Sequence, residues 1–292
     1  MNRTTKLYLI LGVTILIWGT SFVIVDIAIR DGSSPIMLAM ARFMVASTIF
    51  GAFLLWKRPG AIRKEDTRLF LVLAFIGIGV YYIFQYYGIK WAGPTISVIL
   101  VTLLCPVMIF AFTFRRLKEG VTPAQKAGLG ISALGSFMVI TDGTLAIISD
   151  WEQIVGGIFG VICALFWALY TVEGKQLVKR YDPIVSTAHI TIIGTLMLAP
   201  FALADGFLVG QSYPLSFFFC AVYLGVLCTV VGYVFWFRAL TGLEAYATGA
   251  SLYFEPVVTL VFSYILVGEG IGIVAGIGSV ITLLGVVMVS RK

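Results

Sequence analysis

Ionisable side chains stand inside long apolar runs of this sequence, and their types favour binding and proton transfer over covalent catalysis. Glu255 lies within such a run and is followed by Pro256. An ionised carboxylate in an apolar medium is costly unless it is paired or hydrated, and proline frees a carbonyl one helical turn earlier. Glu255 is therefore the first candidate to bind a substrate ammonium group or a coupling proton. The alternative is a protonated glutamic acid that only bonds a neighbouring helix.

Three further ionisable residues are candidates for gating or coupling. Asp26 and Arg42 lie at similar expected depths in successive apolar runs, so we predict that they form an ion pair. The pair could gate access or could be purely structural, and Asp26 could instead be hydrated at a helix end. His189, the single histidine, could relay protons, although a packing role is favoured. One histidine cannot build a multi-histidine metal site, and we predict neither a metal nor a cofactor.

Aromatic residues form the largest group of candidates. Tyr82 and Tyr86 share one helical face, with Gln85 beside them. Aromatic cavities bind apolar or cationic groups, and hydroxyl groups orient them. The predicted substrate-binding set, for each member of which helix packing is the alternative, is Trp18, Tyr82, Gln85, Tyr86, Trp167, Tyr170, Tyr253 and Glu255. Interfacial anchoring is expected instead for Trp56, Trp91, Trp151 and Trp236.

The composition shows which elements must position these residues. The chain has 292 residues, of which 60% are hydrophobic and 12% charged, and its mean hydropathy is +1.03. So few charges cannot cover a soluble surface, and the apolar runs are too long for barrel strands. We therefore predict an all-α integral membrane protein with ten spans. They cover approximately 7–29, 35–56, 69–90, 94–114, 124–141, 153–174, 184–204, 215–237, 245–266 and 271–289.

The distribution of basic residues predicts the orientation of these spans. With ten spans both termini lie on one side, and that side receives all 20 Lys and Arg residues except Arg30, Arg42 and Lys90. Basic residues concentrate in cytoplasmic segments, so we expect both termini to be cytoplasmic and the protein to reside in the inner (cytoplasmic) membrane. The net charge of +6 then records orientation, and no nucleic-acid partner is needed.

The two halves of the sequence are similar. Residues recur at one constant spacing: Pro106 and Val107 as Pro256 and Val257, Glu119 and Gly120 as Glu269 and Gly270, Gly128 as Gly278, and Gly135 as Gly285. Such a register indicates duplication. Each repeat, 1–145 and 146–292, holds five spans, so the second must be inverted, and together they form one membrane domain. Inverted repeats are typical of carriers, although duplication could merely have enlarged a bundle.

The same residues resemble a known family. The stretch from Trp18 to Phe22, with Pro35 and Ala41-Arg42-Phe43, is similar to the opening pattern of the EamA branch of the drug/metabolite transporter superfamily. The stretch from Gly88 through Pro106 to Glu119 resembles its later pattern, which recurs over 225–285. The resemblance covers nearly the whole chain and implies a ten-helix basket that exports small metabolites, notably amino acids. Its cavity would be lined by the first, third, fourth, sixth, eighth and ninth helices. Many members carry lysine where this chain has Asp26.

These observations predict a secondary active or facilitative transporter that exports amino acids or similar small amphipathic metabolites by alternating access. A sugar-phosphate or nucleotide-sugar exchanger is an alternative, yet phosphate favours Lys or Arg and only Arg42 is clearly intramembrane. A hydrophobic-drug exporter, a passive channel and a membrane scaffold are further alternatives. Enzyme motifs such as Gly-x-Ser-x-Gly and Walker A are absent from the sequence.

The expected partners are a small-molecule substrate, membrane lipid and, through Glu255, a coupling proton. The small residues Gly272 and Gly276 share one face of the tenth span. That face could pack closely against another helix, either within the bundle or across a homodimer.

Overall fold

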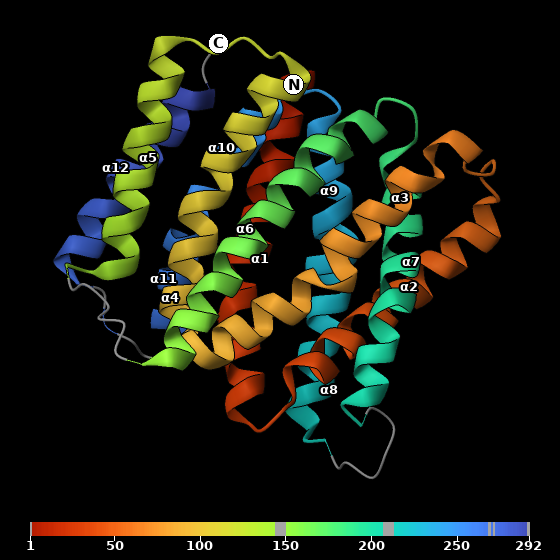
Figure 1. Ribbon diagram of the computed structural model, residues 1–292. Helices are drawn as coiled ribbons and strands as arrows, with labels where there is room; N and C mark the ends of the chain where they lie inside the picture. The colour runs from red at the N-terminus through yellow and green to blue at the C-terminus, as the bar shows by residue number, and fades with distance from the viewer. Residues whose placement is uncertain (1, 144–149, 207–212, 268–269, 271, 291–292) are drawn as a thin grey trace.

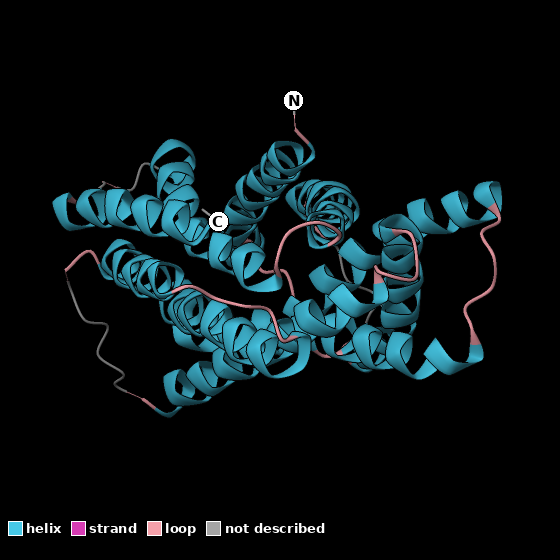
Figure 2. Cartoon of the chain, turned by 90° about the horizontal axis from the view of Figure 1, so that it is seen from above, coloured by secondary structure: helices cyan, strands magenta, loops and turns pink. Residues whose placement is uncertain are grey.

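The structure, a computed structural model, describes residues 2–143, 150–206, 213–267, 270 and 272–290. All regular elements in these ranges are helical, as Figure 2 shows from above, which confirms the predicted all-α fold. In chain order the elements are α1 (Arg3–Arg30), α2 (Pro35–Lys57), η1 (Lys64–Asp66), α3 (Thr67–Ala74), η2 (Phe75–Gly79), α4 (Tyr81–Phe112), η3 (Thr113–Leu117), α5 (Pro123–Thr141), α6 (Trp151–Leu177), α7 (Pro183–Ala204), α8 (Leu215–Tyr223), η4 (Leu224–Val231), α9 (Gly232–Leu240), α10 (Ala245–Ala250), η5 (Ser251–Phe254), α11 (Glu255–Val267) and α12 (Ile273–Ser290).

These elements form ten membrane spans. Eight helical segments of the described chain are long and apolar enough to cross a membrane, and the second half of α4 together with α5 supplies the other two. Three spans are composite, because short π or 3₁₀ turns interrupt them: α3–η2–α4, α8–η4–α9 and α10–η5–α11. Such turns frequently mark functional positions in helices.

The third and fourth predicted spans are not separated by a loop. The expected boundary near 90–94 lies inside α4, whose helical structure continues from Tyr81 to Phe112. Figure 1 shows that the chain nevertheless reverses direction within α4, between its orange and yellow parts.

The two repeats meet where equivalent helices cross. Helices α5 and α12 pack side by side (Figure 1) through glycines. A Cβ atom added to Gly128 would lie 2.7 Å from Met288 Cβ, and one added to Gly278 would lie 2.7 Å from Met138 Cβ. The same glycine–methionine contact therefore occurs twice with the repeats exchanged, as a twofold relation requires. The predicted boundary between the repeats near 145 lies outside the described residues.

The small face that we singled out on the tenth span is not the one used in this crossing. A Cβ added to Gly276 would have no neighbour within 4 Å, and Gly272 lies against the carboxylate of Asp142. Asp142 accepts a hydrogen bond of 2.9 Å from the backbone of Ala275 and so caps α12. Close approach of α5 and α12 depends instead on Gly278 and Gly285. A homodimer through Gly276 stays a prediction.

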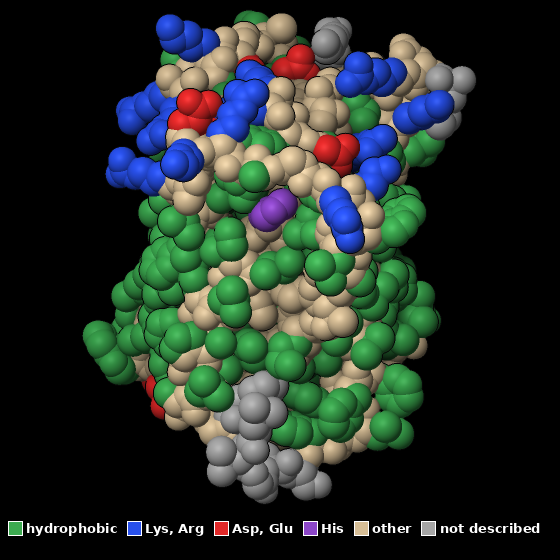
Figure 3. Space-filling view, turned by 90° about the vertical axis from the view of Figure 1, so that its right-hand side faces the viewer, with side chains coloured by type: hydrophobic (Ala, Val, Ile, Leu, Met, Phe, Trp, Pro, Cys, Tyr) green, Lys and Arg blue, Asp and Glu red, His purple; other side chains and the backbone are tan. Residues whose placement is uncertain are grey.

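Charge is distributed unevenly between the two ends of the molecule. Both termini lie at the upper end in Figure 1, which we call the terminal end. Figure 3 shows that Lys and Arg side chains gather there, above a broad hydrophobic surface. The chain is thus a membrane-embedded, multi-pass protein whose terminal end is basic, in agreement with the counted asymmetry.

The α5–α12 crossing can be tested by adding one methyl group. Gly128→Ala places Cβ between Met288 and the carbonyl of Gly285, and overpacking of this kind costs roughly 1–3 kcal/mol. We expect a lower midpoint of thermal unfolding in detergent, followed by circular dichroism. Gly130→Ala on the same helix is the matched control, because nothing lies within 4 Å of its Cβ. Equal midpoints for the two variants would contradict the crossing.

Candidate functional site

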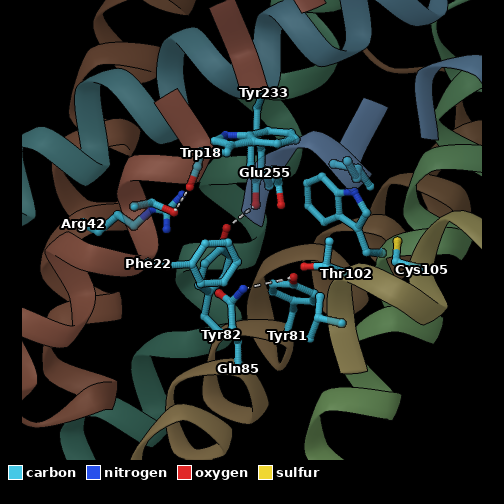
Figure 4. A pocket seen from close by; sticks show the side chains of 14 residues that line it. Trp18, Phe22, Arg42, Tyr81, Tyr82, Gln85, Thr102, Cys105, Tyr233 and Glu255 are labelled. Carbon is cyan, nitrogen blue, oxygen red and sulfur yellow. Dashed lines mark hydrogen bonds between the residues drawn. The ribbon is translucent and has the colours of Figure 1, made fainter. Parts of the chain in front are cut away.

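A small cavity of about 50 Å³ lies between the two repeats (Figure 4). It is lined by α1, α4, α6, α9, η5 and α11, which belong to the helices that the resemblance implied, and also by Arg42 on α2. Its lining residues are Trp18, Ser21, Phe22, Arg42, Tyr81, Tyr82, Gln85, Val101, Thr102, Cys105, Trp167, Tyr233, Leu252 and Glu255. A water molecule needs about 10–15 Å³ of such volume, so the cavity has room for a few water molecules.

Six of the residues predicted from the sequence line this cavity, and the others do not. Those present are Trp18, Arg42, Tyr82, Gln85, Trp167 and Glu255. Tyr86 does not reach the cavity but accepts a hydrogen bond from Arg42, and the buried ring of Tyr170 stacks on Trp167. Tyr253 lies elsewhere, because it packs with Leu129 and Val289 in a separate core and donates to the carbonyl of Leu103 over 3.2 Å.

Glu255 presents a buried carboxylate to the cavity. The chain changes from the 3₁₀ turn η5 to the α-helix α11 at this residue, and the side chain is only 7% exposed. Its carboxylate makes no hydrogen bond or ion pair with any residue that the structure describes. A buried carboxylate without a protein partner is costly, so its compensation must come from a proton, from water or from a ligand in the cavity.

Arg42 supplies a positive charge to the same cavity. The residue is 3% exposed, and Nε donates to Thr229 Oγ1 over 2.7 Å while Nη1 donates to the Tyr86 hydroxyl over 3.2 Å. Its central carbon lies 4.5 Å from the centre of the Tyr82 ring, within cation–π distance. These partners are all neutral, and Arg42 makes no ion pair within the described ranges. It can therefore still pair with an anionic group in the cavity.

The predicted ion pair between Asp26 and Arg42 is wrong. Asp26 instead pairs with Arg30 one turn later on α1, at 2.8 Å between Oδ2 and Nε. A partner four residues away on the same helix is always within reach, whereas similar depth on two helices does not make two side chains face each other. Asp26 does not line the cavity.

Aromatic rings close the cavity on the side of the terminal end. This aromatic cluster comprises Trp18, Trp167, Tyr170, Tyr233, Trp236 and Phe237. The ring centres of Trp18 and Trp167 lie 5.2 Å apart, and Trp18 Nε1 donates to the carbonyl of Cys228 over 2.9 Å. Tyr82 and Tyr233 share a hydrogen bond of 2.5 Å between their hydroxyls. Because each of these two pairs joins near-equivalent positions of the repeats, the cluster lies close to the twofold axis.

Trp236 corrects a prediction made from its position along the chain. We expected it to anchor the interface, but it is 0% exposed and packs against Trp18 and Trp167. The eighth span includes the π turn η4, and its apolar residues continue past Trp236 to Leu240. Trp236 therefore lies inside the bundle. By contrast, Trp56 is 79% exposed at the end of α2, as expected for an anchor.

Three ion pairs connect the repeats at the terminal end. They join the end of α6 and the following turn to the first repeat: Glu173 with Arg116, Lys175 with Glu119, and Arg180 with Asp66. The Lys175–Glu119 pair is 2.5 Å long and mostly buried. At the opposite end, hydrogen bonds connect the repeats, Ser34 to Asp205 and Ser216 to Asp31. The terminal end is thus closed by both rings and charges.

Glu119 stands shortly before α5 but does not cap that helix. The N-terminus of α5 is capped by Thr122, whose hydroxyl accepts from the backbone of Gln125 over 3.2 Å. Glu119 instead accepts from the backbone N–H of Ala245 over 2.9 Å and so caps α10 of the other repeat. The equivalent Glu269 lies outside the described residues.

His189 lies apart from the cavity. Its Nδ1 donates to the carbonyl of Val185 over 2.8 Å, and its ring contacts the edge of Phe70. Figure 3 shows the ring at the surface, just below the basic residues. This geometry agrees with the packing role that was favoured.

Several lining residues were missed, and the repeat could have revealed some of them. Tyr233 occupies nearly the same repeat position as Tyr82, and Cys105 occupies the position equivalent to Glu255. Tyr81 precedes Tyr82 and accepts a hydrogen bond of 3.2 Å from Gln85. No polar signal marked Phe22 or Val101, because a phenylalanine or valine facing a cavity is indistinguishable in sequence from one facing lipid.

Comparison with known proteins agrees with this architecture. A curated relative from Archaeoglobus fulgidus, named an uncharacterized transporter, is 31% identical over 99% of this chain and 98% of its own. A probable terminal-alkyne amino-acid exporter from Streptantibioticus cattleyicolor is 25% identical over 99% of this chain and 95% of its own. One crystal structure has a TM-score of 0.80 at 19% identity, covers 97% of this chain and 98% of the other, and shows the fold alone. The profile of the EamA-like transporter family matches residues 5–141 and again 154–291, so the chain belongs to that family.

Proposed function

We propose that this protein is a secondary transporter that moves α-amino acids or similar small zwitterionic metabolites through the central cavity by alternating access. One observation carries the proposal: buried Arg42 and buried Glu255 line the same cavity, and neither has an ionic partner among the described residues. A zwitterion supplies a carboxylate for Arg42 and an ammonium group for Glu255. The aromatic lining then contacts its side chain.

The size of the cavity supports a moving carrier. Binding sites for small molecules usually measure about 300–1,000 Å³, whereas this cavity measures about 50 Å³. The helices must therefore separate to admit an amino acid. The composite spans place π or 3₁₀ turns next to the lining residues Tyr81, Tyr233 and Glu255, where a hinge would change the cavity most directly.

The charge distribution and a relative support a proposed direction of transport and a proposed membrane. The basic terminal end is proposed to face the cytoplasm, as the positive-inside rule requires, in the inner membrane. The Streptantibioticus relative is named a probable amino-acid exporter, and we extend export of such a substrate to this chain. A carrier with two accessible states moves its substrate down the coupled gradients, so a proton at Glu255 that exchanges with a substrate ammonium group would drive export.

A phosphorylated substrate is a weaker candidate for this cavity. Arg42 is the single basic residue that lines it within the described chain, and Glu255 would repel a doubly charged phosphate. A hydrophobic drug would suit the rings but would leave Arg42 without an anionic partner. The zwitterion alone satisfies both charges.

Removal of the carboxylate tests the proposed site. Glu255→Gln keeps the shape of the side chain but removes the partner of the substrate ammonium group, and loss of such a charged hydrogen bond costs about 1.5–3 kcal/mol. We expect exchange of labelled amino acids in reconstituted vesicles to fall at least tenfold, and its response to a proton gradient to disappear. Glu152→Gln, at an exposed position at the start of α6, is the control. Wild-type rates and pH dependence in Glu255→Gln would refute the role.

The inter-repeat ion pairs should hold the terminal end closed. Lys175→Gln leaves Glu119 partly buried without its cation, and such a loss costs roughly 1–3 kcal/mol or more. We expect reaction of Cys105, which lines the cavity, with a small thiol reagent applied at the terminal end to accelerate about tenfold. The background should lack the other cysteines, Cys163, Cys220 and Cys228.

The control for this experiment is Arg63→Gln, which breaks an exposed pair with Glu65 that does not join the repeats. It should leave the labelling rate of Cys105 unchanged, because exposed pairs contribute little. If Cys105 is labelled at the same rate in Lys175→Gln and Arg63→Gln, the inter-repeat ion pairs do not control access to the cavity.

A further inference from the structure

A second hollow lies on the outer surface of the bundle, between α3 and α6. This lateral groove measures about 410 Å³ and shares no lining residue with the central cavity. Four of its lining residues are charged and four are apolar: Glu65, Arg68, Arg116 and Glu173, and Leu69, Val72, Ile76 and Leu169. The charged residues belong to η1, the start of α3, η3 and the end of α6, which all lie at the terminal end.

The apolar part of the lateral groove faces the membrane. Val72 is 43% exposed, and its neighbours Leu71 and Phe75 on α3–η2 are exposed as well. Large exposed apolar side chains on a membrane span contact acyl chains, because no water is available there. The lateral groove therefore runs from the basic boundary of the membrane into its hydrocarbon region, and the surrounding lipid must fill it.

The two acidic and two basic residues that line the lateral groove balance formally, but with Arg63, which lies next to Glu65, three basic residues face two acidic ones. Glu173 is paired with Arg116, and Glu65 lies 3.6 Å from Arg63. Arg68 is exposed and has no ion pair with any residue in the described ranges. One positive charge thus stays uncompensated where the apolar residues meet the water boundary. Basic pockets between spans at this depth favour anionic head groups.

We propose that the lateral groove binds an anionic phospholipid from the leaflet at the terminal end. Its phosphate lies at Arg68, beside Arg116, and one acyl chain lies along Leu69, Val72 and Leu169. The order of charged and apolar residues along the lateral groove matches the order of head group and chain in a phospholipid. A zwitterionic phospholipid would fill the apolar part equally well and would also offer a phosphate to Arg68, but its ammonium group would restore the positive charge that the phosphate removes. Selectivity therefore resides in the net charge of the head group.

The proposed lipid would contact the helix that closes the terminal end. Leu169 precedes Tyr170 of the aromatic cluster, and Glu173 belongs to the inter-repeat ion pairs. An acyl chain on Leu169 and a phosphate beside Arg116 therefore support α6 from outside, whereas the cluster and the ion pairs hold it from inside. This site does not depend on which solute the central cavity carries.

Lipid retention by the full-length protein tests the head-group preference. In native mass spectrometry from detergent, we expect phosphatidylglycerol to be retained about fivefold more than phosphatidylcholine with the same chains, because one basic residue contributes roughly that factor. Arg68→Gln should abolish the difference. Lys64→Gln removes the same charge at an exposed residue of η1 that does not line the lateral groove, and it should preserve the difference. Equal retention of the two lipids by the wild type, or equal effects of the two variants, would overturn the proposal.

A fluorescent position in the lateral groove gives an independent measurement. Leu169→Trp should be quenched strongly by a minority of brominated phosphatidylglycerol in phosphatidylcholine vesicles, because the site concentrates that lipid. Leu134→Trp, on the exposed face of α5, reports the bulk bilayer. The signal of the native tryptophans in the wild type is subtracted from both. Similar quenching at the two positions would show ordinary bilayer contact and exclude a selective site. Equal quenching at position 169 by brominated phosphatidylglycerol and brominated phosphatidylcholine would do the same.

Discussion

The architecture depends on the cost of placing charge inside a membrane. Most of the ionisable residues lie at the ends of the helices, and the buried exceptions Arg42 and Glu255 line the central cavity. Arg42 is held by two hydroxyl groups and two aromatic rings, those of Tyr82 and Phe43, which compensate part of its desolvation without neutralising its charge. An internal carboxylate on Arg42 would have been more stable but would have competed with any anionic substrate. The positive charge of Arg42 thus stays available for the carboxylate of a zwitterionic substrate, which would neutralise it.

Duplication explains how the cavity is closed and also why it is chemically asymmetric. The Trp18–Trp167 and Tyr82–Tyr233 pairs join near-equivalent residues, so the repeats meet there through similar rings. Glu255, however, has Cys105 as its equivalent. A symmetric cavity would carry two carboxylates and no direction, whereas one carboxylate facing one arginine gives a bound zwitterion a defined orientation. The similar rings of the two repeats therefore suit a conformational change between two related states. The difference between Glu255 and Cys105 suits recognition of an oriented substrate.

The sequence predicted the fold because lipid imposes one requirement on every span, and apolar runs record it directly. It predicted Glu255, Arg42, Trp18 and Trp167 for a related reason, since a polar or large aromatic residue in such a run needs a partner or a cavity. The sequence did not predict how each helix is rotated about its own axis, and therefore which side chains face each other. Depth along a span placed Asp26 near Arg42, but only the packed helices show which way each side chain points.

The π turns are a second reason why the sequence did not show which way the side chains of a span point. The π turns η2 and η4 lie in the third span of each repeat, just before Tyr81 in one and Tyr233 in the other. Each π turn rotates the residues that follow it relative to a regular α-helix, and the tyrosines that follow the two turns, Tyr82 and Tyr233, share a hydrogen bond between their hydroxyls. The pattern of apolar residues does not reveal a π turn. For that reason Trp236 was predicted at the membrane interface, although it lies inside the bundle. A change in either turn would rotate one tyrosine away from the other and open the aromatic cluster, which links local backbone geometry to access from the terminal end.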